Sequence, residues 1–71
     1  MRRAAAIGDE RRLGGYALAG AWVVAAAPEN AGAAWDALPE DVALVVLSPD
    51  VYPALAPRLD ERPDVVWAVL P

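Results

Sequence analysis

The hydrophobic residues of this chain gather in four short runs, and the segments between the runs mix polar and apolar positions. The runs occupy residues 3–8, 21–27, 42–47 and 64–70, and the last three are rich in valine. Runs of this length, without alternating polar residues, are typical of strands that are buried on both faces of a parallel sheet. The pattern therefore predicts four parallel strands.

The three connecting segments have the periodicity of helices. Apolar residues recur in them at intervals of three and four positions, so they share one face of a helix. The three stripes are Leu13, Tyr16, Ala17 and Gly20; Ala31, Ala34, Trp35 and Leu38; and Val51, Leu55 and Leu59. Because Pro53 and Pro57 each remove a backbone donor, we expect the third helix, within residues 48–61, to be kinked or to begin only near Pro53.

Polar residues mark the points where two of the helices should begin. Asp9 is expected to cap the first helix, with Glu10 in its first turn, where a carboxylate complements the helix dipole. Ser48 is expected to cap the third helix, with Pro49 at its first position.

Strands and helices thus alternate along the chain, which predicts an α/β fold of three layers. With right-handed crossovers, the arrangement that follows is a small flavodoxin-like (Rossmann-like) fold, whose four-stranded parallel sheet has the order 2-1-3-4 and carries three helices. Residues 1–71 are expected to form a single domain. A domain of this size buries only about 60% of its unfolded surface, so we expect another protein to contribute to its stability.

The composition argues against several kinds of site. The chain has no cysteine and no histidine, which removes disulfides, thiolate metal sites and the commonest zinc ligand. Its net charge is −4 and lysine is absent, whereas a surface that binds nucleic acid needs clustered basic residues. We therefore predict no metal, no cofactor and no nucleic-acid partner.

Residues 13–28 carry no charge and follow two pairs of arginines, a pattern that faintly suggests a signal peptide cleaved after Ala25–Ala27. Asp9 and Glu10 stand where such a leader should be positive, which argues against this interpretation. The stretch is also too short and too weakly apolar to span a bilayer. We expect a cytoplasmic protein that does not insert into the membrane.

The glycines between Gly8 and Gly20 invite a comparison with phosphate-binding loops. Such loops need either G-x-G-x-x-G directly after a strand or G-x-x-x-x-G-K-[ST]. Here Gly8 is followed by Asp9 and Glu10 and then by two arginines, so neither motif is present. Two acids at a helix N-terminus would also repel a phosphate.

Phosphoacceptor receiver domains share the predicted topology, and Asp9, Glu10 and Asp50 could imitate their acidic residues. Their chemistry also needs a lysine, which this chain lacks, and Asp50 lies three residues past the third run rather than at its end. Ser48, the only serine, is interpreted as a helix cap rather than a nucleophile. We therefore predict no catalytic residue.

The aromatic residues are the remaining candidates for function. Tyr16 and Trp35 lie on the predicted core stripes, whereas Trp22 and Trp67 lie in the predicted edge strands, where core and interface roles are both open. Large aromatic residues often dominate protein interfaces. The candidate interface residues are Arg12, Tyr16, Trp22 and Trp67.

Two N-terminal motifs resemble the F subunit family of the V-type (vacuolar and archaeal-type, also bacterial) ATP synthase/ATPase. That family typically opens with a strand ending in Ile-Gly-Asp, followed after a spacer by Gly-Phe-x-Leu-Ala-Gly. This chain has Ile7-Gly8-Asp9 and then Gly15–Gly20, with Tyr16 in place of the phenylalanine. Beyond residue 20 the likeness is one of layout, including Pro28-Glu29 before the second helix and Leu70-Pro71 after the fourth strand.

The resemblance implies a non-catalytic subunit of the central stalk, or rotor. Such a subunit docks on the coiled-coil D subunit, which forms the shaft beneath the A/B catalytic head, and supports the coupling of ATP hydrolysis or synthesis to hydrogen ion or other ion transport. It would lie in the cytoplasm, peripheral to the membrane. The family's helix after the fourth strand has no counterpart in residues 1–71, so we expect a half-uncovered sheet face, with Trp67 and Val69 exposed beside the first helix. That face would support obligate binding or a homodimer.

Two other interpretations stay open at this point. One is a stand-alone flavodoxin-like interaction module, such as a degenerate receiver that only mediates protein contacts. The other is a small-ligand-binding or enzymatic Rossmann-like fragment. A gene neighbourhood that encodes the A, B and D subunits of the ATPase would favour the rotor subunit.

Overall fold

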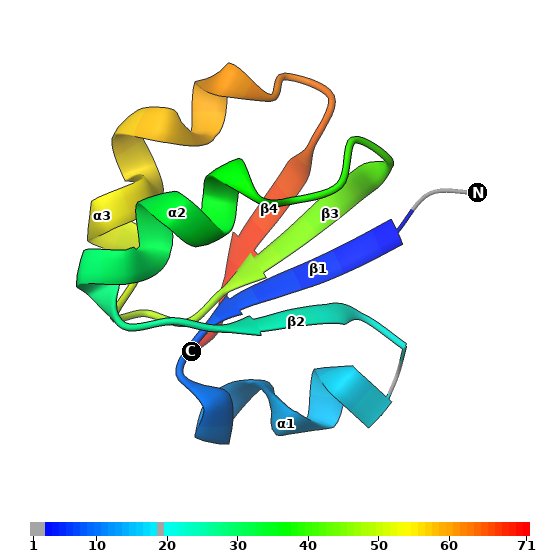
Figure 1. The fold of residues 1–71 in the computed structure, drawn as a ribbon, viewed down its shortest axis with the longest axis vertical. Helices are drawn as coiled ribbons and strands as arrows, with labels where there is room; N and C mark the ends of the chain where they lie inside the picture. Colours follow the sequence, from blue (N-terminus) through cyan, green and yellow to red (C-terminus); the bar gives the residue numbers. More distant parts are fainter. Residues whose placement is uncertain (1–2, 19) are drawn as a thin grey trace.

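The computed structural model describes residues 3–18 and 20–71, except for the side chains of residues 15–18. The described part contains one sheet of four strands (Figure 1), which are β1 (Arg3–Gly8), β2 (Trp22–Ala25), β3 (Val42–Leu47) and β4 (Val66–Val69). Every neighbouring pair is parallel and the order is β2-β1-β3-β4. The predicted sheet and its order 2-1-3-4 are confirmed, and the architecture is that of a flavodoxin-like fold.

Three helical segments connect the strands. They are α1 (Glu10–Leu18), then α2 (Ala31–Asp36) preceded by the short 3-10 turn η1 (Pro28–Asn30), then α3 (Tyr52–Leu55) followed directly by the 3-10 segment η2 (Ala56–Glu61). The irregular third segment, with Pro53 in its first turn and Pro57 at the change to 3-10 geometry, confirms the expected late start and kink. The prediction that Ser48 caps this helix is wrong, because Val51 holds the capping position and makes no side-chain bond.

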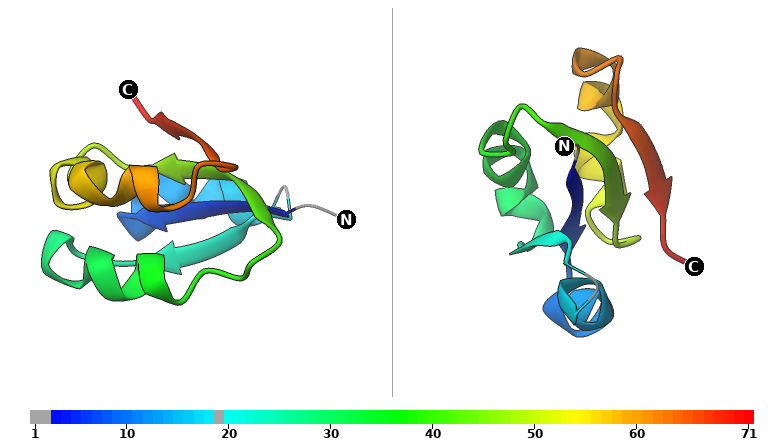
Figure 2. Two further views of the ribbon diagram at one scale, coloured as in Figure 1. Left: turned by 90° about the horizontal axis from the view of Figure 1, so that it is seen from above. Right: turned by 90° about the vertical axis from the view of Figure 1, so that its right-hand side faces the viewer.

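The helices lie on both sides of the sheet, with α1 on one face and α2, α3 and η2 on the other (Figures 1 and 2). The main core lies between β1, β3 and the second group of helices, and it contains the predicted stripes of the second and third helices. Its buried members are Ala5, Ile7, Ala31, Ala34, Trp35, Leu38, Val42, Val45, Leu47, Val51, Leu55 and Leu59.

A smaller apolar contact forms beneath α1. Ala6 points away from the main core, because side chains alternate along a strand, and both Ala6 and Leu13 are fully buried. The first turn of the helix is capped as predicted, since the Arg11 N–H donates to Asp9 Oδ1 at 3.2 Å. Tyr16 and Ala17 of the predicted stripe have side chains outside the described part of the structure.

The helix α1 packs against β1 and β2, which leaves the β3–β4 half of its face uncovered by any described element. The strand register places Leu44 beside Val66 and Val46 beside Ala68 on this half. We call these four residues the uncovered face. Leu44 is 38% exposed and Val66 is 67% exposed.

The prediction that Trp67 and Val69 lie on the uncovered face is wrong for both residues. Trp67 is in register with Val45, and Val69 with Leu47, so both point to the opposite side, where Val45 and Leu47 are buried. The Trp67 ring stacks on Tyr52 of α3 with 5.6 Å between ring centroids. An uncovered half-face does exist, as predicted, but it is formed by the alternate residues of the same two strands.

Candidate functional site

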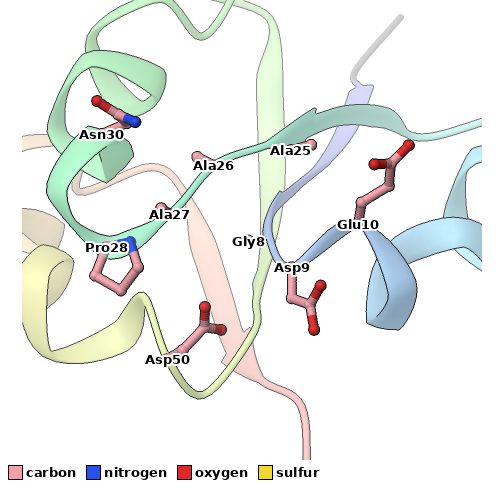
Figure 3. A pocket seen from close by; sticks show the side chains of 9 residues that line it. All are labelled: Gly8, Asp9, Glu10, Ala25, Ala26, Ala27, Pro28, Asn30 and Asp50. Atoms are coloured by element: carbon pink, nitrogen blue, oxygen red, sulfur yellow. The ribbon is translucent and has the colours of Figure 1, made fainter.

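A cleft of about 420 Å³ lies at the carboxyl ends of β1, β2 and β3 (Figure 3). Its walls are Gly8–Glu10 after β1, Ala25–Pro28 and Asn30 after β2, and Asp50 after β3. The strand order reverses between β1 and β3, and open α/β sheets bind their ligands at this kind of switch point. The position of the cleft therefore makes it the first candidate for a site.

Behind this cleft, Ser48 links the ends of β1 and β3 by hydrogen bonds. Its Oγ accepts the Asp9 N–H at 3.0 Å and donates its own proton to the Asp50 carboxylate. Ser48 is fully buried, and Gly8, with φ +144°, lies directly against it. Because both the proton and a lone pair of this hydroxyl are engaged, Ser48 acts as a structural bridge.

The ionisable side chains that line the cleft are acidic. Asp9, Glu10 and Asp50 contribute carboxylates, and its described lining residues include no basic side chain (Figure 3). The start of α1, where a helix could bind an anion, is already occupied by the Asp9 carboxylate. Among residues 3–18 and 20–71 no group of three or more acidic side chains is placed to hold a metal ion.

We expect Ser48→Ala to destabilise the protein by about 1–2 kcal/mol, because the Asp9 N–H and the Asp50 carboxylate both lose their partner. Urea denaturation followed by circular dichroism would measure the change. Asp50→Asn is the matched control, since an amide oxygen can still accept the Ser48 proton, and its effect should be the smaller one. Equal stability of Ser48→Ala and the wild type would contradict the bridging role.

The three predicted interface residues whose side chains the structure describes, Arg12, Trp22 and Trp67, do not form one surface. Trp22 and Trp67 lie on β2 and β4, at opposite edges of the sheet. Arg12 lies on α1, where its Nη1 donates to the Pro71 carbonyl oxygen at 3.3 Å. Tyr16 also belongs to α1, and its side chain lies outside the described part of the structure. Trp22 is 45% exposed, with the Arg3 guanidinium 5.6 Å from its ring centroid.

A second polar cluster, which the sequence did not reveal, joins α2 to η2. The Arg58 guanidinium pairs with Asp36 and Glu61 and also donates to the Gly32 carbonyl oxygen. Trp35 Nε1 donates to Glu61 Oε1 at 3.3 Å. Nothing in the spacing of these residues signals the cluster, since Arg58 and Asp36 are 22 positions apart. The cluster fastens the two helical segments over the main core.

The same cluster makes stability depend on pH. Hydrogen bonds from the Arg58 guanidinium hold the pKa values of Asp36 and Glu61 below their ordinary range. A carboxylate whose pKa is lowered by folding stabilises the protein above its unfolded pKa, and this contribution is lost as the pH falls through the folded value.

We therefore expect the melting temperature to fall as the pH drops below about 4. The double variant Asp36→Asn/Glu61→Gln should be less stable at neutral pH and should show a shallower fall, because it has fewer carboxylates to protonate. Thermal melts from pH 7 to pH 2 would test this, with Glu29→Gln, at an exposed position on η1, as the control. Identical slopes for the wild type and the double variant would contradict the assignment.

Comparisons of the chain with family models, with curated proteins and with solved structures gave no significant match. No described helix is long and apolar enough to cross a lipid bilayer. The geometry of the described residues and the two N-terminal motifs are therefore the basis of the functional proposal below.

Proposed function

We propose that this chain is a non-catalytic, protein-binding subunit of the central stalk of a V/A-type ATP synthase/ATPase. In this role it docks on the coiled-coil D subunit beneath the A/B head and supports the coupling of ATP hydrolysis or synthesis to ion transport. It works in the cytoplasm, at the membrane-bound complex. The observation that carries the proposal is the uncovered apolar face beside α1.

The uncovered face supports a helical protein partner. Parallel sheets normally have both faces covered by helices, and here β3 and β4 lack this cover on the α1 side within the described chain. Leu44 and Val66 are both substantially exposed there. A helix of a coiled coil laid alongside α1 would bury these side chains and complete the layer.

The two N-terminal motifs support the choice of this family. Asp9, from the first motif, caps α1, and Gly20, from the second, has φ +89° just beyond the helix. The motif residues thus lie at the two ends of the helix that borders the uncovered face. The spacing of the two motifs matches the length of α1, and α1 forms one wall of the proposed docking surface.

The direct test is co-expression with the D subunit of the same organism, followed by chromatography with light scattering. We expect a complex that contains the two subunits in equal numbers. Leu44→Asp and Val66→Asp should each weaken the complex at least about tenfold, since a buried unpaired carboxylate opposes docking. Trp22→Asp is the matched control, because it introduces the same charge at an exposed apolar residue that points to the other face.

If the chain is folded but forms no complex with the D subunit, the rotor assignment is contradicted. A complex that Trp22→Asp alone disrupts would show that docking uses the β2 edge instead of the uncovered face.

The second candidate is a degenerate receiver-like module that mediates protein contacts. It is favoured by the cleft, because acids that follow β1 and β3 meet there at the switch point. Partners captured in cross-linking experiments, with no component of the ATPase among them, would favour this candidate.

A further inference from the structure

We propose that β4 is a dimerisation strand, which pairs antiparallel with β4 of a second copy and joins the two sheets into one of eight strands. This inference does not rest on the proposed stalk function. It rests on the free edge of β4, on the residues of that edge and on the charges at its two ends.

The strand β4 lies at the edge of the sheet, with no described element beyond it (Figure 2). The Leu70 N–H donates to the Leu47 carbonyl oxygen of β3 at 2.9 Å. Because hydrogen-bonding groups alternate in direction along a strand, the N–H and C=O groups of Trp67 and Val69 point away from β3. They form a row of backbone donors and acceptors that another strand can pair with.

Residues 65–70 lack the charged side chains and prolines that protect many edge strands. The stretch has no charged residue and no proline, and all four side chains of β4 are exposed. Soluble proteins usually interrupt such edges with lysine, proline or a bulge. The other edge, β2, is less open, since only two of its four side chains are exposed. A free apolar edge of this kind is a template for pairing.

The charges at the two ends of β4 select an antiparallel second copy. Asp64 is exposed two residues before the strand, and Arg12 Nη1 donates to the carbonyl oxygen of Pro71, two residues after it, at 3.3 Å. Antiparallel pairing about a two-fold axis brings Asp64 of each copy close to Arg12 of the other. Parallel pairing would instead place like charges together.

In two registers of the antiparallel pair, the outward-pointing N–H and C=O groups of Trp67 and Val69 can form hydrogen bonds with the second copy. Trp67 lies opposite either Trp67 or Val69 of the second copy, and both registers bring Asp64 within two residues of Pro71 of that copy. The two-fold axis is perpendicular to the sheet, so the uncovered faces of the two copies stay on the same side. The dimer therefore carries one continuous apolar surface, built from Val66 and Ala68 of both copies.

The test is sedimentation equilibrium of the purified chain from about 1 to 200 µM, a range in which edge-paired dimers of moderate affinity dissociate. We expect the mass to approach twice the 7.5 kDa of the monomer. Val69→Pro removes an outward N–H without touching the β3 pairing, and it should raise the dimer Kd about thirtyfold or more. Val69→Ala keeps that N–H and is the matched control.

Exchanging the charges of Asp64 and Arg12 provides a second test, which can be used if the Val69→Pro variant does not fold. Asp64→Arg and Arg12→Asp should each raise the dimer Kd about tenfold, and the double variant should restore most of the affinity. A 7.5 kDa mass at every concentration would overturn the proposal. So would equal effects of Val69→Pro and Val69→Ala, or a double variant weaker than either single variant.

Discussion

Replacing Gly8 by alanine is expected to destabilise the protein by about 4 kcal/mol, because the new side chain has no room and the backbone no longer suits it. A Cβ at this position would lie 1.7 Å from Ser48 Oγ and 2.5 Å from Ser48 Cβ. The φ of +144° is also one that residues with side chains rarely adopt. A domain of this length has a free energy of unfolding of about 4–10 kcal/mol, so the substitution removes between about two fifths and all of its stability.

Gly14→Ala is the matched control for this prediction. Gly14 lies within α1, is exposed, and has no atom within 4 Å of the position that a Cβ would take. Alanine there should stabilise the protein by about 0.5–1 kcal/mol, because it favours the helix. Urea denaturation of both variants, followed by circular dichroism, would measure the two opposite shifts. A Gly8→Ala protein as stable as the wild type would show that β1 and β3 do not meet closely at Ser48.

Trp35→Ala is expected to cost about 4 kcal/mol in the free energy of unfolding, since it empties the centre of the main core. Trp35 is 1% exposed and is the largest fully buried side chain. Its Nε1 donates to Glu61, and the Arg62 guanidinium lies 5.4 Å from its ring centroid. The variant therefore loses apolar burial and also the contact that holds η2 over α2.

Two controls separate these contributions. Trp35→Phe keeps an aromatic ring in the core and should cost about half as much as Trp35→Ala. Trp22→Ala removes an indole that is 45% exposed at the sheet edge, and it should cost less than about 1 kcal/mol. Chemical denaturation followed by circular dichroism is suitable, because its signal does not depend on the tryptophan that is removed. Equal losses for Trp22→Ala and Trp35→Ala would contradict the assignment of the core.

The importance of Trp35 could be predicted from the sequence, whereas the reason for Gly8 could not. Trp35 stands on a helical stripe with Ala31, Ala34 and Leu38, and all four are buried. The constraint on Gly8 comes from Ser48, forty residues later, and no local pattern signals that the two would meet. The same distance in sequence explains why Ser48 was wrongly interpreted as a helix cap.

The surfaces on which the two proposals rest also depend on contacts between distant segments. The uncovered face could be expected, because three helices cannot cover both sides of four strands. Its residues could not be identified, because residues 42–47 and 65–70 are apolar at every position. Such a run does not show which side chains point to which face of the sheet. Only the register of β4 on β3 shows that Val66 lies on the uncovered face and that Trp67 stacks on Tyr52 instead.

The amino-acid order of this protein thus determines its elements, its strand order and its helical stripes, because these depend on periodicity, on proline and cap positions and on the handedness of crossovers. The contacts of Gly8 with Ser48, the Arg58 cluster, the members of the uncovered face and the free groups of β4 depend on which distant segments become neighbours. Such neighbours arise only when the chain has folded, since packing and register are properties of pairs of elements and not of any single stretch of residues.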